Sequence, residues 1–170
     1  MYQDASWKVY ENPTPYGAAW IVHETIVEPS HERLLGRLGG KDIDLRRQAL
    51  IGESMDAALA PRIEGANEGV SFQAYGANRL ELTAHASSRG LLVLSEFFYP
   101  GWRATVNGKE EPIYRVDGVL RGIAIPRGES RVVVQYSPGS VFGGAALSLS
   151  AFFGVLLALV LHKRRYAFRS

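Results

Sequence analysis

The chain has 170 residues, a hydrophobic fraction of 46%, a charged fraction of 21% and a formal net charge of +2. This length fits one domain, or one domain plus an appendage, and so small a net charge argues against nucleic acid as a partner. The chain has no cysteine, which excludes a disulfide framework, a thiol nucleophile and a Cys-ligated metal site.

Residues 1–68 read as an extended, partly helical lead-in that we expect to pack on the domain that follows. Two β-rich runs are Trp7–Tyr10 and Ala19–Val27. Ser30 is predicted to cap a short helix over residues 31–38. After this helical insert, the letters "IDLRRQALIG" predict a turn that leads into a short strand.

Residues 69–139 have the texture of an antiparallel β-sandwich or jelly roll. Short β-branched and aromatic runs, about seven of them, follow one another at a spacing typical of such folds. Asn107–Gly108 and Asp117–Gly118 are strong hairpin signals, because both central residues of a type I′ turn need positive φ. The apolar alternation of two strands predicts one buried face each, at Leu80, Leu82 and Ala84, and at Val132, Val134 and Tyr136.

Residues 141–161, "VFGGAALSLSAFFGVLLALVL", carry no charged side chain. About 20 apolar residues are needed to cross a hydrocarbon core of about 30 Å, so we predict one transmembrane helix over residues 140–162. The basic tail, residues 163–170, is then expected to be cytoplasmic by the positive-inside rule. This predicts a cell-membrane protein whose N-terminal domain is extracytoplasmic, with the lipid bilayer as a partner.

The N-terminus shows no signal peptide. A single C-terminal span does not by itself explain how the domain before it would cross the membrane. We therefore expect the chain to be the C-terminal piece of a longer polytopic protein, with Met1 an internal or misassigned start.

Catalytic motifs are absent from the sequence. It contains no HExxH, GxSxG, GxGxxG or GxxxxGK[ST] pattern, and its four histidines do not fall at metal-ligand spacing. We predict no catalytic residue, no metal and no cofactor. A glycosidase needs two carboxylates across a cleft, and a soluble hydrolase is the weaker alternative that the carboxylates near one aromatic turn leave open: Glu96, Glu110, Glu111 and Asp117.

That aromatic turn is the stretch "SEFFYPGWRATVNGKE", residues 95–110, which predicts a strand, a Pro-Gly bend and a hairpin strand. Core packing is the favoured interpretation of Phe97 and Trp102, since burying each ring is worth about 1.5–3 kcal/mol. Exposed Tyr and Trp faces also bind sugars. Tyr99, Trp102 and Glu96 are therefore the candidate ligand-binding residues.

The same region resembles the C-terminal part of the bacterial YfhO family of membrane proteins. The resemblance is carried by "LSE" at residues 94–96, "YPGW" at residues 99–102, the Asn107-Gly108-Lys109 turn, and the segments "IYRVDGVLRG" and "IPRGESRVVVQYSP". It extends over most of residues 7–160. In the lead-in, Tyr16–Gly17 stand where the family usually has an arginine-bearing stretch.

This resemblance implies a polytopic protein similar to GT-C glycosyltransferases, whose catalytic acid lies in an upstream extracytoplasmic loop. We therefore expect a non-catalytic, membrane-anchored extracytoplasmic domain of such an enzyme, involved in modifying cell-envelope polysaccharide or glycolipid. Its expected partners are the upstream membrane domain and a cell-envelope glycan. The alternative is a stand-alone, membrane-tethered carbohydrate-binding or protein-interaction module.

Overall fold

Short strands separated by tight turns fold into two large sheets that face each other. The computed structural model describes residues 2–3, 8–9, 15–40, 42–56, 58–139, 143–144 and 147–157. Its regular elements are β1 (Tyr2–Gln3), β2 (Lys8–Val9), β3 (Ala19–Val22), β4 (Glu24–Val27), α1 (His31–Leu38), β5 (Gln48–Ile51), β6 (Gly69–Tyr75), β7 (Arg79–Ala86), β8 (Gly90–Phe97), β9 (Trp102–Val106), β10 (Lys109–Glu111), β11 (Ile113–Val116), β12 (Leu120–Ile125) and β13 (Gly128–Tyr136). The chain divides into two compact units, residues 1–135 and 136–170.

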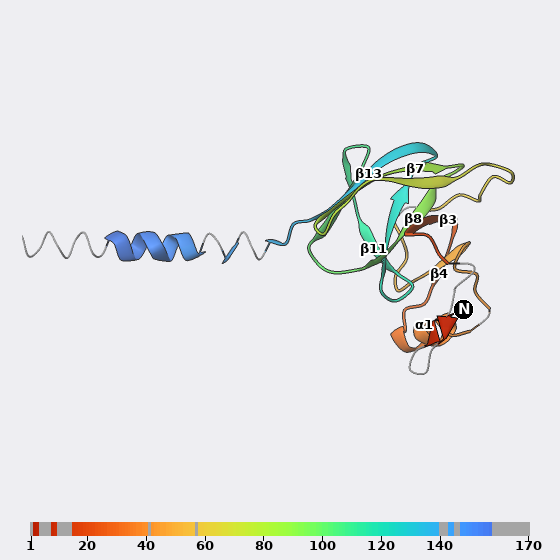
Figure 1. Cartoon of the computed structure of the whole chain (residues 1–170), viewed down its shortest axis with the longest axis horizontal. Coiled ribbons are helices and arrows are strands. Elements are labelled where there is room, and N and C mark those ends of the chain that lie inside the picture. The colour runs from red at the N-terminus through yellow and green to blue at the C-terminus, as the bar shows by residue number, and fades with distance from the viewer. Residues whose placement is uncertain are drawn as a thin grey trace, which may run out of the picture. The chain divides into compact units, whose positions relative to one another are not determined.

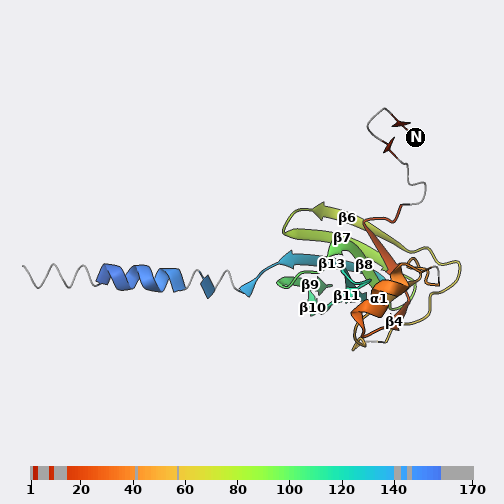
Figure 2. The ribbon, with the colours of Figure 1, turned by 90° about the horizontal axis from the view of Figure 1, so that it is seen from below.

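The first unit holds a five-stranded sheet in the order β10-β9-β13-β7-β6 and a six-stranded sheet in the order β3-β8-β12-β11-β5-β4. Strands β7 and β13 of one sheet lie over β8 of the other (Figure 1), and β6, β7, β13 and β9 follow one another across the five-stranded sheet (Figure 2). Strands β1 and β2 form a separate antiparallel pair. The predicted mainly β sandwich is therefore confirmed, and one strand pair in it, β4 with β5, is parallel.

The space between the two sheets is filled by one apolar cluster. Leu80, Leu82 and Ala84 of β7 and Val132 and Val134 of β13 point into it, as their alternation predicts. Ala104 and Val106 of β9 lie on the same side, and the facing sheet contributes Leu92 and Leu94 of β8 and Ile123 and Ile125 of β12. Because each strand buries alternate side chains here, this cluster determines which residues of each strand face inward.

A second cluster covers the other face of the six-stranded sheet. It contains Val22, Ala49, Ile51, Leu91, Val93 and Val116. The run Leu91–Leu94 is buried on both faces, which explains why β8 reads as a continuous apolar segment rather than an alternating one. Strands β3, β4 and β5, which precede residue 69, thus contribute to the same sheet as β8, β11 and β12.

The six-stranded sheet is curled. Its edge strands β3 and β4 are separated in the chain by His23 alone. In a flat sheet of six strands the edges would lie about 24 Å apart at about 4.8 Å per strand, whereas the two steps from Val22 to Glu24 reach about 7 Å at most. The sheet must therefore curl until its edges meet at His23, around the second apolar cluster.

Two local predictions from the sequence are confirmed at turns and caps. Asn107 and Gly108 have φ of 53° and 81°, and Val106 pairs with Lys109 across a two-residue hairpin turn. The Ser30 side chain accepts a hydrogen bond from the Arg33 amide at the start of α1. At Asp117–Gly118 both φ values are positive as well, and Val119 adds a third residue to the loop.

The prediction of a transmembrane helix over residues 140–162 is contradicted. No helix among the residues that the structure describes is long and apolar enough to cross a membrane. Residues 139, 143–144 and 147–157 are helical.

The prediction rested on the apolarity of residues 141–161, which measures preference for lipid. Residues 140–142, 145–146 and 158–170, which include the basic tail at 163–170, lie outside the described residues.

Candidate functional site

The aromatic turn connects the two sheets. Strand β8 belongs to the six-stranded sheet and β9 to the five-stranded sheet, and the chain crosses between them at Pro100–Gly101. Gly101 has a φ of 102°, which a residue with a Cβ rarely adopts. The predicted strand, Pro-Gly bend and hairpin strand are all present, but the bend changes sheets as well as direction.

Core packing of Phe97 is a wrong prediction, because its side chain is 73% exposed. The cause is a β-bulge in β8: Arg121 of β12 pairs with Leu94, whereas the neighbouring Leu120 pairs with Phe97. The extra residues of β8 break the inward-outward alternation, as bulges do. Phe97 therefore lies beyond the end of the core.

Trp102 is half-buried and packs against the cluster between the sheets, as predicted. Its indole ring also stacks on the guanidinium of Arg121, whose Cζ lies 3.9 Å from the ring centroid. Tyr99, on the crossing segment, is 63% exposed. Of the candidate ligand-binding residues, Trp102 is therefore partly packed in the core, whereas Tyr99 is exposed to solvent.

Glu96 lies beside the same arginine. Its carboxylate accepts a hydrogen bond from the Tyr75 hydroxyl of β6. Arg121 is 4% exposed, and its Nε donates to the Phe97 carbonyl oxygen at 2.8 Å. Burial lowers the pKa of the Arg121 guanidinium, and the negative charge of Glu96 acts in the opposite direction. Glu96 and Trp102 are thus joined through Arg121, a residue that sequence reasoning missed.

One signal could have identified Arg121. It has the same parity in β12 as Ile123 and Ile125, which are buried between the sheets. A charged residue at an inward position of a strand is unusual unless it is paired or used.

A cavity of about 400 Å³ adjoins Trp102. It is lined by Trp102, Arg103, Ala104, Glu110, Glu111, Pro112 and Ile113. Its charged lining includes an ion pair between Arg103 and Glu110, with 3.7 Å between nitrogen and oxygen. An aromatic side chain beside polar groups that accept and donate hydrogen bonds is the chemistry that pockets for polar ligands use.

The carboxylates of the hydrolase alternative do not gather around one cleft. Glu110 and Glu111 lie on β10 in the five-stranded sheet, whereas Asp117 lies in the β11–β12 turn of the six-stranded sheet. Asp117 is buried and accepts a hydrogen bond from the Leu50 amide at 2.8 Å. Burial raises the pKa of this carboxyl. Its position and contacts indicate a structural role in holding β5 to the turn.

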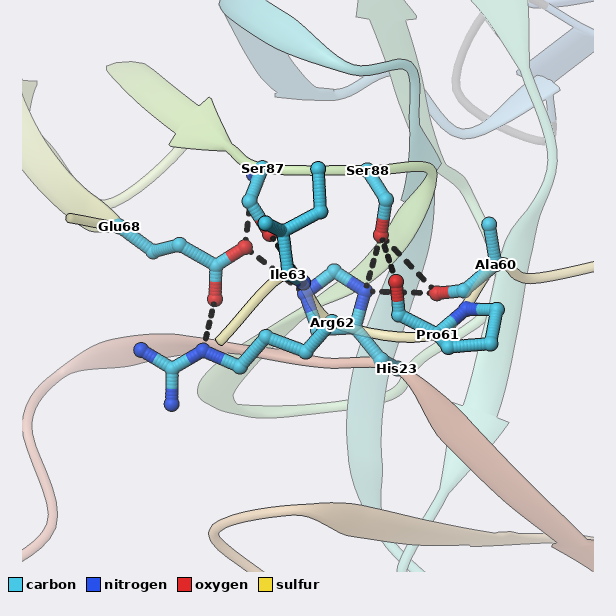
Figure 3. Close-up of polar contacts among 8 residues, drawn as sticks. All are labelled: His23, Ala60, Pro61, Arg62, Ile63, Glu68, Ser87 and Ser88. Carbon is cyan, nitrogen blue, oxygen red and sulfur yellow. Dashed lines mark hydrogen bonds and ion pairs between the residues drawn. The ribbon is translucent and has the colours of Figure 1, made fainter. Parts of the chain in front are cut away.

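A second polar cluster lies where β3 bends into β4 (Figure 3). His23 Nε2 lies 2.9 Å from Glu68 Oε1, and His23 Nδ1 lies 3.0 Å from the Ala60 carbonyl oxygen and 3.1 Å from Ser88 Oγ. The side chains of His23 and Glu68 are each 8% exposed. The cluster therefore ties together the bend at His23, the connection that contains Ala60, and the turn between β7 and β8.

The contacts of Glu68 extend this cluster. Its Oε1 accepts from the Ser87 amide at 2.7 Å, and its Oε2 lies 2.9 Å from Arg62 Nε. Burial raises the pKa of the Glu68 carboxyl, but the hydrogen bonds from Ser87 and the interactions with His23 outweigh this, and the net pKa lies below its ordinary value.

A Ser-His-Glu set invites comparison with a hydrolytic triad, and the geometry argues against it. A nucleophilic serine needs an unprotonated ring nitrogen as its base. Here His23 Nδ1 faces the Ala60 carbonyl, which only accepts, so the ring holds a hydrogen on that nitrogen. The Ser88 hydroxyl lies 2.7 Å from the Pro61 carbonyl oxygen and 3.0 Å from that of Ala60. This serine is therefore a structural donor.

Beside this cluster lies a larger cavity of about 850 Å³, whose lining includes His23, Arg46, Arg47 and Arg62. Each arginine already has a partner: Arg46 lies over the Tyr16 ring, Arg47 faces Asp44, and Arg62 pairs with Glu68. Among the residues that the structure describes, no three His, Asp or Glu side chains are placed to hold a metal ion.

The fold and these contacts define a β-sandwich domain with polar clusters that hold its segments together and an aromatic site at the crossing between its sheets. The sequence model of the family described as "Bacterial membrane protein YfhO" matches residues 40–148, which is more than half of the chain. The chain therefore belongs to the YfhO family of bacterial membrane proteins, which confirms the resemblance. No curated protein and no solved structure matches the chain.

Proposed function

We propose that this chain forms a non-catalytic, extracytoplasmic domain of a YfhO-like membrane glycosyltransferase that modifies cell-envelope polysaccharide or glycolipid. Membership of a bacterial membrane protein family supports the membrane context. The structural role of the His23 cluster and the separation of the carboxylates support a domain without its own catalytic centre. The domain's contribution is contact with the glycan.

The observation that carries the proposal is the site at the sheet crossing. It combines the half-buried indole of Trp102, the exposed ring of Tyr99 and a cavity of about 400 Å³ beside Trp102. Aromatic rings cover the apolar faces of sugars, and neighbouring charged side chains hydrogen-bond to hydroxyls. Glu110, Glu111 and Arg103 supply those groups.

The test measures the binding of cell-envelope polysaccharide fragments to the purified full chain by isothermal titration calorimetry. Trp102→Ala is expected to weaken binding about tenfold, because loss of an aromatic contact is worth about 1.5 kcal/mol. Tyr99→Ala is expected to act in the same direction. Tyr16→Ala, which removes an exposed aromatic ring outside the site, is the matched control. Equal affinity of wild type, Trp102→Ala and Tyr16→Ala would contradict the proposal.

The exposure of Phe97 favours a second candidate, a protein-interaction module. The Phe97 side chain is 73% exposed, beside the exposed Tyr99. It has no polar group that could hydrogen-bond to a sugar. Its partner would be the membrane-embedded part of a YfhO-like protein. A photo-crosslinking residue at position 97 tests this candidate: cross-links to a membrane protein support it, and cross-links to glycan alone count against it.

A further inference from the structure

Two arginines face each other across neighbouring strands near the aromatic site. Arg115 of β11 is the cross-strand partner of Arg121 of β12. The pair Ile113 and Ile123 lies two residues away along the same two strands. Ile123 is buried in the cluster between the sheets and Ile113 packs against it. Because side chains of one face recur every second residue, both arginines lie on this same face, at the end of the core. Like charges directly opposite each other destabilise a sheet.

No carboxylate among the described residues lies within ion-pair distance of either guanidinium. Glu96 acts on Arg121 through its charge, but its carboxylate accepts from the Tyr75 hydroxyl. Arg121 Nη1 is buried and has no hydrogen-bond partner in the part of the chain that the structure describes. A buried donor that lacks an acceptor is costly, and so is a second positive charge opposite it, so stability alone does not account for this arrangement.

We propose that Arg115 and Arg121 form a binding site for an anionic group, a carboxylate or a phosphate, carried by the glycan that Trp102 contacts. This inference rests on the proposed function and names the chemical class of the ligand. A guanidinium matches the geometry of both oxyanions and binds either through paired hydrogen bonds. An oxyanion between the two side chains removes their repulsion.

The two arginines have different parts in this site. Arg115 is exposed and meets the anion from solvent. Arg121 is buried, its Nε is held by the Phe97 carbonyl and its plane stacks on the Trp102 ring. It therefore supplies a fixed positive charge and links the anion site to the aromatic ring. A sugar that stacks near Trp102 would carry its acidic substituent toward this pair.

The test compares acidic and neutral sugars with the full chain by isothermal titration calorimetry. The probes are D-glucuronic acid, glucose 6-phosphate and D-glucose. At least one acidic sugar is expected to bind about tenfold or more tightly than glucose, since a charge-assisted hydrogen bond contributes at least that much. Comparison of the two acidic probes separates a carboxylate site from a phosphate site. High salt is expected to reduce the difference.

Arg115→Gln is expected to abolish the preference for the acidic sugar without affecting the fold, because this side chain is exposed. Arg127→Gln, at an exposed turn, is the matched control and should leave the preference unchanged. Glu96→Gln should strengthen binding of the acidic sugar, because it removes the negative charge that acts on Arg121.

Equal affinity for acidic and neutral sugars, or an unchanged preference in Arg115→Gln, would overturn the inference. The same measurements distinguish failure of the anion site from failure of the proposed function. If neutral and acidic sugars bind with equal affinity and Trp102→Ala abolishes that binding, glycan contact stands while the anion site is rejected. If no sugar binds, both are rejected.

Discussion

Glu68 offers a direct test of the idea that the His23 cluster holds the domain together. We consider Glu68→Gln, which keeps the shape of the side chain and removes its charge. The carboxylate has contacts with the Ser87 amide at 2.7 Å, His23 Nε2 at 2.9 Å and Arg62 Nε at 2.9 Å. The amide oxygen of glutamine can replace Oε1 and accept from both the Ser87 amide and His23 Nε2, but without a full negative charge, and its amino group cannot accept from Arg62.

The expected loss follows from these contacts. A hydrogen bond to a charged group contributes about 1.5–3 kcal/mol and a neutral one about 0.5–1.5 kcal/mol, so loss of the charge weakens each of the two bonds at Oε1 by about 1 kcal/mol or more. The Arg62 side chain is 56% exposed, so solvent screening limits that contact to about 1 kcal/mol or less. We therefore expect Glu68→Gln to lower the free energy of unfolding by about 2–4 kcal/mol at neutral pH. Urea denaturation of the full chain, followed by circular dichroism, measures this loss.

The effect should also depend on pH. Because the pKa of Glu68 is lower in the folded chain than its ordinary value of 4.5, its ionised form stabilises the fold above that value. This contribution is lost as pH falls through the folded-state pKa. The difference in stability between wild type and Glu68→Gln should therefore shrink when the pH is lowered from 7 to 3.

Glu64→Gln is the matched control, because Glu64 lies on the same connection with an exposed side chain. It should change stability by about 0.5 kcal/mol or less. A loss in Glu68→Gln no larger than in this control, or a difference that grows on acidification, would refute the reasoning.

Three further predictions concern a close contact at Gly122, the backbone of the turn glycine Gly108 and the buried carboxyl of Asp117. Gly122→Ala should cost about 1–3 kcal/mol of stability in urea denaturation, because a Cβ there would lie 2.7 Å from a Val116 methyl; Gly52→Ala, with open space, is the control. Gly108→Ala should cost about 1–2 kcal/mol, because its φ of 81° is unfavourable for alanine, and an unchanged melting midpoint would contradict this. The raised pKa of Asp117 means that the folded state favours its protonated form, so this group lowers stability as pH rises from 3.8 through the folded-state value. Asp117→Asn should therefore be more stable than wild type at pH 7, with no such gain at pH 3.

Short-range features were predictable from the sequence. The hairpin turn at Asn107–Gly108 and the N-cap at Ser30 appear where the residues indicate them. The alternation of β7 and β13 predicted their buried residues, such as Leu82 and Val132. These features depend on backbone sterics and on side-chain period, which act over a few residues and are therefore visible in the sequence itself.

The components of the candidate site were predictable only in part. Trp102 was expected to pack on the core and does so, whereas Phe97 was expected there and is exposed. Nothing in the letters around Phe97 shows that β8 has a bulge, because the bulge exists only relative to the register of β12. In the sequence alone, Arg121 is one charged residue among others on a predicted strand. Its burial follows only from the packing of the two sheets around it.

The family of the chain, its β-rich character, its turns and most of its inward-facing residues follow from the sequence alone. The tertiary structure decided which residues meet: His23 with Glu68 and Ser88, and Arg121 with Trp102. The physical reason is common to these cases. Strand register and sheet curl depend on contacts between distant segments, and local propensity does not carry that information.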